Sequence, residues 1–346
     1  MLRCILLLTA LLALPAFAQP LMPGTETAPV TPELTPEQRL TQFRHDEINL
    51  LALRGDAHSL LAAALMAQAD AQDKRRPPAL KSPALLKRAQ QAGADDALVW
   101  WVSAAVECHD KAKTCPSTQT LQKLESVDAE NAAVWALSLW HSQQAKDEPT
   151  ARAALTSAAQ AKRYNDYFGA TIAILYDATS ILPMSAELLN ATGQNTGVDG
   201  YRLSSSAVIA ATSLPPSAGA IAAMCKDATA DTRLVDCVSV AKTLAASGSV
   251  MAQHFGVSLL ESLLQPGPEL DAAHAHARSL AWQMQRISEL GDRLANDSRV
   301  SRVYTQALSE HGDEIAAVQA MLRSQGVTLE PPADWQPPQP DVMPKP

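Results

Sequence analysis

Apolar residues recur at helical spacing along most of the chain between residues 36 and 326. In residues 268–290, apolar or small side chains stand three or four positions apart and therefore share one face of a helix. They are Leu270, Ala273, Ala277, Leu280, Met284 and Ile287. Strand-like alternation of Val and Ile is missing. The pattern predicts helices over residues 36–54, 56–73, 83–92, 95–108, 117–127, 130–146, 149–162, 166–181, 184–191, 199–213, 217–226, 231–247, 249–264, 268–290, 298–310 and 313–325.

Part of this helical pattern repeats. When Trp100 is aligned with Trp135, 35 residues later, several further positions match: Leu86 with Leu121, Ala97 with Ala132, Val99 with Val134 and Ser103 with Ser138. A period of 34–35 residues is typical of helix–turn–helix repeats, which bury their apolar faces against their neighbours. Residues 40–180 therefore resemble tetratricopeptide or Sel-like repeats, although the Gly, Tyr and Pro positions of that family are not all present. The resemblance implies a curved scaffold that binds peptides or proteins and has no catalytic residue.

We therefore expect an all-α protein, a TPR-like α-solenoid with proline-rich ends. Its repeats would span residues 36–181, and residues 182–326, which show no clear period, would be the C-terminal half of the same solenoid. Residues 19–35 and 327–346 are rich in proline, which excludes helix and central strand. The first is predicted to be an extended leader and the second a disordered tail. Two alternatives are that Trp335 docks the tail on the body or that the tail binds a partner.

The first 18 residues have the pattern of a secretory signal peptide. Arg3 precedes an apolar run, and Ala16-Phe17-Ala18 fits a cleavage site, so we expect the mature chain to begin at Gln19. The apolar run is too short for a transmembrane helix, and no integral membrane span is expected later in the chain. The signal looks bacterial, which predicts a periplasmic or secreted protein.

The cysteines support an oxidising compartment. Cleavage would remove Cys4 and leave an even number, Cys108, Cys115, Cys225 and Cys237. The predicted pairs are Cys108 with Cys115 and Cys225 with Cys237, each across a turn between two helices. Other pairings remain open at this stage.

Composition and charge exclude two classes of protein. Hydrophobic residues make up 47%, too many for a disordered chain, and the net charge of −8 argues against a nucleic-acid partner. One stretch departs from this balance, since residues 74–94 carry only basic charges: Lys74, Arg75, Arg76, Lys81, Lys87 and Arg88. They form either a solvated surface or a site for an anionic partner.

Two groups of residues are candidates for binding a protein or peptide partner. Aromatic side chains gather at Tyr164, Tyr167, Phe168 and Tyr176, although helix packing would equally explain them. On the predicted helix 268–290, Trp282 lies opposite the apolar face, with Arg278 and Arg286 one turn away on either side. Such a Trp is either an interface residue or packs against a neighbouring helix with the arginines over its ring.

Signatures of catalysis are missing. The chain lacks Gly-x-Ser-x-Gly, His-Glu-x-x-His and a glycine-rich phosphate loop, and no cofactor is expected. His274 and His276 point about 160° apart around a helix and cannot bind one metal ion together. We expect a periplasmic interaction or envelope-assembly scaffold. The alternatives are a hydrolase, for example one acting on peptidoglycan, and a purely structural envelope protein. A buried Asp or Glu in a cleft would favour the hydrolase.

Overall fold

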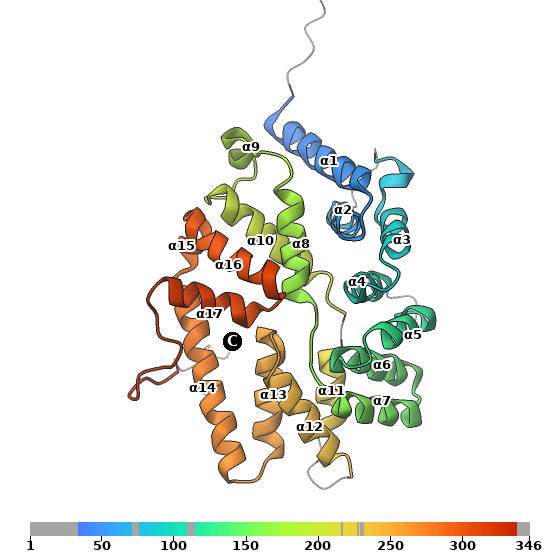
Figure 1. Ribbon diagram of the computed structural model, residues 1–346, viewed down its shortest axis with the longest axis vertical. Coiled ribbons are helices and arrows are strands. Elements are labelled where there is room, and N and C mark those ends of the chain that lie inside the picture. Colours follow the sequence, from blue (N-terminus) through green and yellow to red (C-terminus); the bar gives the residue numbers. More distant parts are fainter. Residues whose placement is uncertain are drawn as a thin grey trace, which may run out of the picture. The chain divides into compact units, whose positions relative to one another are not determined.

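The residues that the structure describes form helices joined by turns and loops. This computed structural model describes residues 34–70, 76–108, 115–215, 217–226, 228 and 232–337 (Figure 1). Within those ranges it contains seventeen α-helices, one 3-10 helix and no β-strand. Their bounds are α1 Pro36–Arg54, α2 Ala57–Ala69, η1 Pro78–Leu80, α3 Ser82–Ala92, α4 Ala97–Glu107, α5 Thr118–Val127, α6 Ala132–Ala145, α7 Glu148–Gln160, α8 Phe168–Thr179, α9 Ala186–Ala191, α10 Val198–Ala211, α11 Ala218–Cys225, α12 Leu234–Ala245, α13 Val250–Leu263, α14 Pro268–Glu289, α15 Gly291–Asn296, α16 Ser298–His311 and α17 Glu314–Ser324.

The prediction of an all-helical protein is confirmed, and most predicted helix bounds lie within two residues of those observed. The helical pattern of the sequence did not predict η1 or α15. It also extended α2 to residue 73, whereas the helix ends at Ala69. The reason is Arg76, whose guanidinium donates to the carbonyl of Ala67 (2.8 Å) and to the carboxylate of Asp70 (2.9 Å). A cation there satisfies carbonyls at the helix C-terminus.

Side-chain caps explain where many of the helices begin. The residue before the helix accepts a hydrogen bond from a backbone N–H of the first turn through its carboxylate, amide or hydroxyl oxygen. The residues that do so are Asp56, Asp96, Ser117, Asn131, Asp147, Ser185, Ser249, Asp297 and Asp313. The helix starts are therefore encoded locally in the sequence.

Two neighbouring helix pairs, α3–α4 and α5–α6, share the same internal bonds at a spacing of 35 residues. The indole N–H of Trp100 donates to the carbonyl of Ala94 (2.8 Å), and that of Trp135 donates to the carbonyl of Ala129 (2.7 Å). In both pairs a serine of the second helix also bonds to the first helix, Ser103 with Gln90 and Ser138 with Glu125. The 35-residue correspondence in the sequence is thus also a correspondence of contacts.

Helix α8 links early and late parts of the chain. It contacts α2, α10 and α16, and Figure 1 shows it (light green) between the α1–α4 region and the α15–α16 region. Below it, α6 contacts α11 and α7 contacts α12, while α13 contacts α14. Helix α17 packs on α14 and α16. As a result, the turn that leads into α8 lies close to helices from the last third of the chain.

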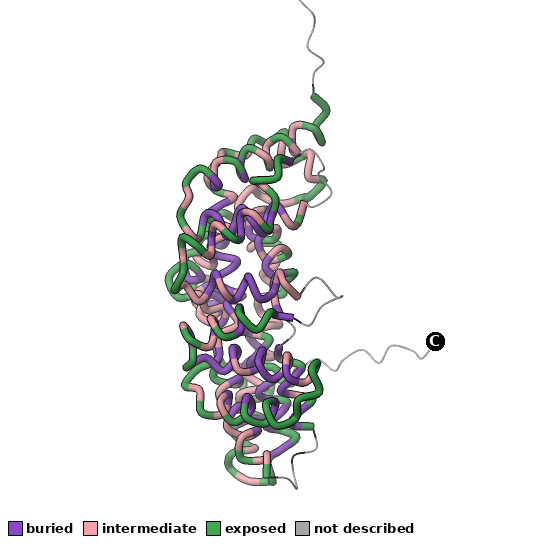
Figure 2. Tube along the Cα trace, turned by 90° about the vertical axis from the view of Figure 1, so that its right-hand side faces the viewer, coloured by how far each residue is buried: buried purple, intermediate pink, exposed green. Residues whose placement is uncertain are grey.

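Residues 36–346 form one compact unit, and residues 1–35 belong to another. Its main apolar core extends from Ile48 to Ala317, and Figure 2 shows buried residues (purple) in every part of the unit. A smaller cluster consists of Val300, Val318, Met321 and Leu322, against which Val327 and Leu329 pack. The segment that follows α17 is therefore part of the packed structure.

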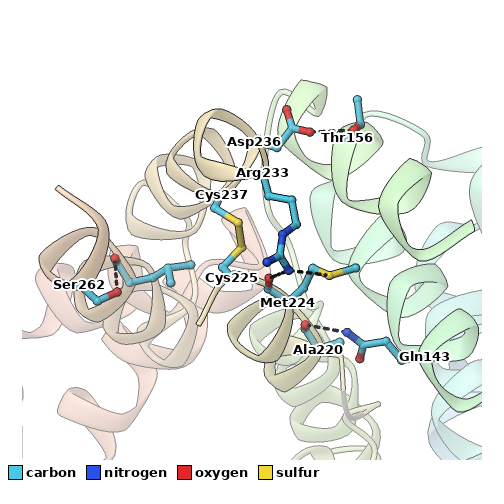
Figure 3. The surroundings of a disulfide bond; sticks show 10 residues. Gln143, Thr156, Ala220, Met224, Cys225, Arg233, Asp236, Cys237 and Ser262 are labelled. Atoms are coloured by element: carbon cyan, nitrogen blue, oxygen red, sulfur yellow. Dashed lines mark hydrogen bonds between the residues drawn. A yellow bond between two sulfur atoms is a disulfide. The ribbon is translucent and has the colours of Figure 1, made fainter. Parts of the chain in front are cut away.

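The two predicted cysteine pairs lie at disulfide distance. The Cα atoms are 5.0 Å apart in the Cys108–Cys115 pair and 5.7 Å apart in the Cys225–Cys237 pair. Figure 3 shows the second pair, which joins the end of α11 to α12. Two side chains of α6 and α7 fasten the joined helices to the rest of the protein: Gln143 donates to the carbonyl of Ala220, and Thr156 donates to Asp236.

Several predicted segments lie outside the described residues. These are the signal peptide, the leader up to residue 33 and the last nine residues of the tail. Within the described ranges, no helix is long and apolar enough to cross a lipid bilayer.

Candidate functional site

Three helix N-termini meet at one place, which we call the three-turn junction. It comprises residues 166–169, 247–250 and 311–314, where α8, α13 and α17 begin. The Ser249 hydroxyl donates to the carboxylate of Asp166, 83 residues away (2.7 Å). The N–H of Ile315 donates to the carbonyl of Gly248 (3.1 Å). The junction therefore joins segments that are distant in the sequence.

Glycine permits this close approach. A Cβ atom at Gly169 would lie 2.7 Å from the carbonyl oxygen of Gly312, and a Cβ atom at Gly248 would lie 2.5 Å from Cγ of Asp313. Gly312 itself ends α16 in the left-handed conformation, with φ 63°. Larger residues at these positions would force the turns apart.

The junction forms where the 35-residue pattern changes. Asp96, Asn131 and Asp166 follow one another at that spacing, and each accepts a hydrogen bond from the N–H two residues later. The first two are followed by a Val-Trp pair, at residues 99–100 and 134–135, whereas the third is followed by Gly169-Ala170. The smaller side chains leave room for the turn between α16 and α17.

Helix capping brings the acidic side chains together. Asp166 accepts from the N–H of Phe168 (3.1 Å), Asp313 from that of Ala316 (2.8 Å) and Glu314 from that of Val250 (3.2 Å). Negative charge is favourable at helix N-termini because the backbone N–H groups there are unpaired. A structural role therefore accounts for these carboxylates, and any chemistry they perform would be additional.

Asp166, Ser249 and Glu314 also form a coupled acid group. Burial raises the pKa of Asp166 above its ordinary value, and it raises the pKa of Glu314 to about 7, with a smaller contribution from the charge of Asp166. The Ser249 hydroxyl donates its one proton to Asp166, and the backbone N–H of Val250 donates to Glu314. The arrangement places two carboxyl groups with raised pKa values at the start of α13.

Two cavities border this acid group, and Asp166, Ser249 and Glu314 line both. The first has a volume of about 440 Å³ and a basic rim, to which Lys162, Arg163, Lys242 and His311 contribute. The second has a volume of about 660 Å³ and is mainly apolar; its lining includes Phe168, Leu214, Met251, His254 and Phe255. Met251 and Phe255 are 56% and 40% exposed. Chemically, the site can exchange a proton with a group bound in either cavity.

The four predicted aromatic residues do not share one surface. Tyr164 and Tyr167 are buried, with 4% and 9% of their surfaces exposed, and the Tyr167 hydroxyl donates to Asp128. Phe168 is half-buried and Tyr176 lies about two turns further along α8. Tyr164 nevertheless lines the basic-rimmed cavity and Phe168 the apolar one. The predicted turn therefore borders the junction, mostly through side chains that serve the core.

Arg278, Trp282 and Arg286 do come together, and the chain's own tail covers them. The indole N–H of Trp282 donates to the carbonyl of Thr328 (2.8 Å), and only 8% of Trp282 is exposed. Trp335 packs edge-on against it, with ring centroids 5.4 Å apart. Arg286 lies over the Trp282 ring, 4.3 Å from its centroid, as in the packing alternative. Of the alternatives for the tail, docking through Trp335 is the one observed, so the prediction of a disordered tail is wrong for residues 327–337.

The tail is held mainly through its backbone. Arg278 donates to the carbonyls of Pro332, Ala333 and Trp335. Ser279 and Gln283 both donate to the carbonyl of Leu329, and the Trp335 indole donates to Gln285 (3.2 Å). We call this surface of α14 the tail groove; it consists of Arg278, Ser279, Trp282, Gln283, Gln285 and Arg286. Bonds to carbonyls place few demands on the side chains of the bound segment.

Part of the basic stretch, residues 74–94, makes structural contacts. Arg76 is buried and caps α2, and Arg88 donates to the carbonyl of Ala52 (2.7 Å) near the end of α1. Lys81 and Lys87 are exposed, whereas Lys74 and Arg75 lie outside the described residues. The described members therefore do not form a continuous basic surface.

Sequence reasoning missed Asp166, Ser249 and Glu314. Each resembles an ordinary residue at a helix start, and only the fold brings them together. The one available signal was the loss of the Val-Trp pair after Asp166. Comparisons with family models, curated proteins and solved structures yield no match for this chain.

Proposed function

We propose that this protein is a helical-repeat scaffold of the bacterial envelope that binds extended, proline-containing peptide segments without covalent chemistry. One observation carries the proposal: the tail groove holds residues 328–335 through seven hydrogen bonds from its own side chains to backbone carbonyls. An extended segment of another protein would offer the same carbonyls.

The chemistry of the groove suits this kind of ligand. Proline-rich segments have no N–H at each proline and lose little conformational entropy on binding, so they are recognised through carbonyls and aromatic packing. The groove supplies both, because Arg278 donates to three carbonyls and Trp282 packs against the bound Trp335. Trp and Arg are also the residues that contribute most at interfaces.

A TPR-like repeat architecture belongs to the same proposal. It is supported by the matching bonds of α3–α4 and α5–α6 at a spacing of 35 residues. The periplasmic location is supported by the two cysteine pairs at disulfide distance, since such bonds persist in oxidising compartments.

A labelled peptide with the sequence of residues 327–337 tests the proposal by fluorescence polarisation. In the intact chain the attached tail competes at an effective concentration on the order of millimolar, so the free peptide should bind weakly. In full-length Trp335→Ala, whose tail has lost its anchor, the peptide should bind at least tenfold more tightly. Adding Arg278→Ala should abolish this gain.

Arg299→Ala, added to Trp335→Ala, is the matched control, because Arg299 is an exposed arginine of α16 outside the groove. It should leave peptide binding unchanged. Equal binding by the intact chain and by Trp335→Ala would contradict the proposal, as would peptide binding that does not depend on Arg278. The affinities of a set of unrelated proline-rich peptides then show how strongly binding to the groove depends on peptide sequence.

A second function is favoured by a separate observation, the acid group at the three-turn junction. General acid–base hydrolysis uses paired carboxyl groups, at least one of them with a raised pKa. Asp166 and Glu314 both have raised pKa values, and both line the two cavities. We propose hydrolysis of a cell-wall polymer as the alternative. The purified protein would then release soluble fragments from peptidoglycan, and Glu314→Gln would stop the release while the helical circular dichroism stays unchanged. No release by the intact protein would eliminate this alternative.

A further inference from the structure

A third cavity, with a lining that shares no residue with either site, lies where helices α1 and α2 meet α8 and α10. Its volume is about 390 Å³, within the range of about 300–1,000 Å³ that is typical of small-molecule sites. Apolar side chains from α1, α2, α10 and the loop between α8 and α9 form much of its wall: Leu40, Phe43, Ile48, Met66, Met184, Val208 and Ile209. Val208 is 66% exposed, which places it at the mouth.

A buried carboxyl group without a partner faces this cavity. Glu47 is only 3% exposed and lines the cavity, and burial and the charges of Arg202 and Arg44 act on its carboxyl, with no hydrogen bond from a described residue among these influences. A buried carboxyl that makes no hydrogen bond costs stability, so such groups are rare unless a ligand or water satisfies them. This feature points to a ligand with a polar end.

The charges that surround the cavity favour an anion. Its charged lining residues are Arg44, Glu47, Asp70 and Arg202. Asp70 pairs with Arg76 (2.9 Å), and Arg202 lies 4.0 Å from Asp199. Arg44 donates only to the Tyr201 hydroxyl (3.3 Å) among the described residues. While Glu47 is protonated, one positive charge therefore has no counter-ion, and the neutral carboxyl is itself a hydrogen-bond donor.

We infer that this cavity binds an amphipathic monoanion of the medium-chain carboxylate class, with its carboxylate near Arg44 and Glu47 and its chain along the apolar wall. The ligand would be a free fatty acid or the acyl product of lipid breakdown. A cationic amphiphile fits the same wall, but it would meet two guanidinium groups.

Calorimetric titration of the full-length protein with three probes of equal chain length tests this inference: decanoate, decanol and decyltrimethylammonium. Decanoate should bind at least tenfold more tightly than the other two. Arg44→Gln should weaken decanoate binding about tenfold without affecting decanol, and Arg44 is exposed, so the variant is expected to fold. Equal affinities for all three probes, or tighter binding of the cation, would overturn the inference.

A matched pair of valines locates the site. Val208→Trp should block the mouth of the cavity and remove decanoate binding, whereas Val235→Trp, at a valine of α12 that is still more exposed (76%), should not. Decanoate binding that survives Val208→Trp would place the ligand elsewhere and contradict the inference. Binding should also weaken above about pH 8, where Glu47 ionises and repels the ligand, and Glu47→Gln should remove this decline.

Discussion

Replacing Glu47 by Gln should stabilise the protein at neutral pH, although Glu47 belongs to the core. The side chain is almost fully buried on α1. Burial raises the pKa of Glu47 to about 8, and the nearby Arg202 and Arg44 offset only part of this effect. At pH 7 the carboxyl is therefore mainly neutral in the folded protein but ionised in the unfolded chain.

The size of the effect follows from this difference. Between pH 4.5 and about 8, the folded protein keeps a proton that the unfolded chain has released, so the free energy of unfolding falls as pH rises. Each pH unit in this window costs about 1.4 kcal/mol, which gives about 3 kcal/mol at pH 7. Gln is nearly isosteric and does not titrate. Glu47→Gln should therefore add up to about 3 kcal/mol at pH 7 and almost nothing near pH 4.5.

Urea unfolding followed by circular dichroism at about pH 5 and pH 7 measures this, without ligand. Glu269→Gln is the control, because Glu269 is an exposed residue of α14 and its replacement should change little at either pH. A gain of equal size at both pH values would refute the reasoning, because only a titrating carboxyl makes the gain depend on pH. A loss of stability at pH 7 would show that Glu47 is ionised and paired in the folded state.

Three further predictions concern the packing that holds the sites in place. Gly256→Ala should lower the free energy of unfolding by about 1–3 kcal/mol, because the new Cβ would lie 2.3 Å from the backbone nitrogen of Ala245 on α12. Gly219→Ala on α11 is the control and should not destabilise the protein, because its Cβ would meet nothing within 4 Å. Asn131→Ala should lower the free energy of unfolding, measured in urea, by about 2–4 kcal/mol. The Asn131 amide makes four hydrogen bonds, with Asp128, Ala133 and both backbone groups of Asn165. Replacing Cys225 and Cys237 together by Ser should lower the thermal midpoint and reduce the free energy of unfolding by about 2–3 kcal/mol, as expected for opening a loop of 12 residues. An unchanged midpoint would mean that the pair does not stabilise the fold.

The helices could be predicted from the sequence because their signals are local. Apolar residues at a spacing of three and four, together with Asp, Asn or Ser before the first turn, determine a helix independently of its neighbours. The exceptions illustrate the limit. Helix α15 has only six residues and begins with Gly291, so it carries almost no periodic pattern. The early end of α2 depends on Arg76, a residue beyond the helix itself.

The sites could be predicted only in part, because their residues come together through tertiary contacts. Arg278, Trp282 and Arg286 were identified because they lie one turn apart on a single helix. The sequence did not show that the C-terminal tail covers these three residues. The groove binds the tail through backbone carbonyls, which leave no recognisable side-chain pattern in the bound segment. Asp166 and Glu314 are separated by most of the second half of the chain, and nothing local distinguishes them from ordinary caps. The same is true of Glu47, whose carboxyl is unusual only because of the space around it.

The three-turn junction suggests how a repeating chain acquires a site. In α4 and α6, the Val of the Val-Trp pair is fully buried and the Trp reaches back to the preceding turn, so the hairpin closes on itself. Before α8, Asp166 keeps the bond to the N–H two residues later, but Gly169 and Ala170 cannot fill that space. The Cα of Ala170 lies 3.8 Å from the position that a Cβ of Gly312 would occupy, so the α16–α17 turn occupies it instead. Capping groups from three helices then face one another around a region that no large side chain fills. A break in the 35-residue correspondence, rather than a new motif, therefore brings Asp166, Ser249 and Glu314 together beside the two cavities.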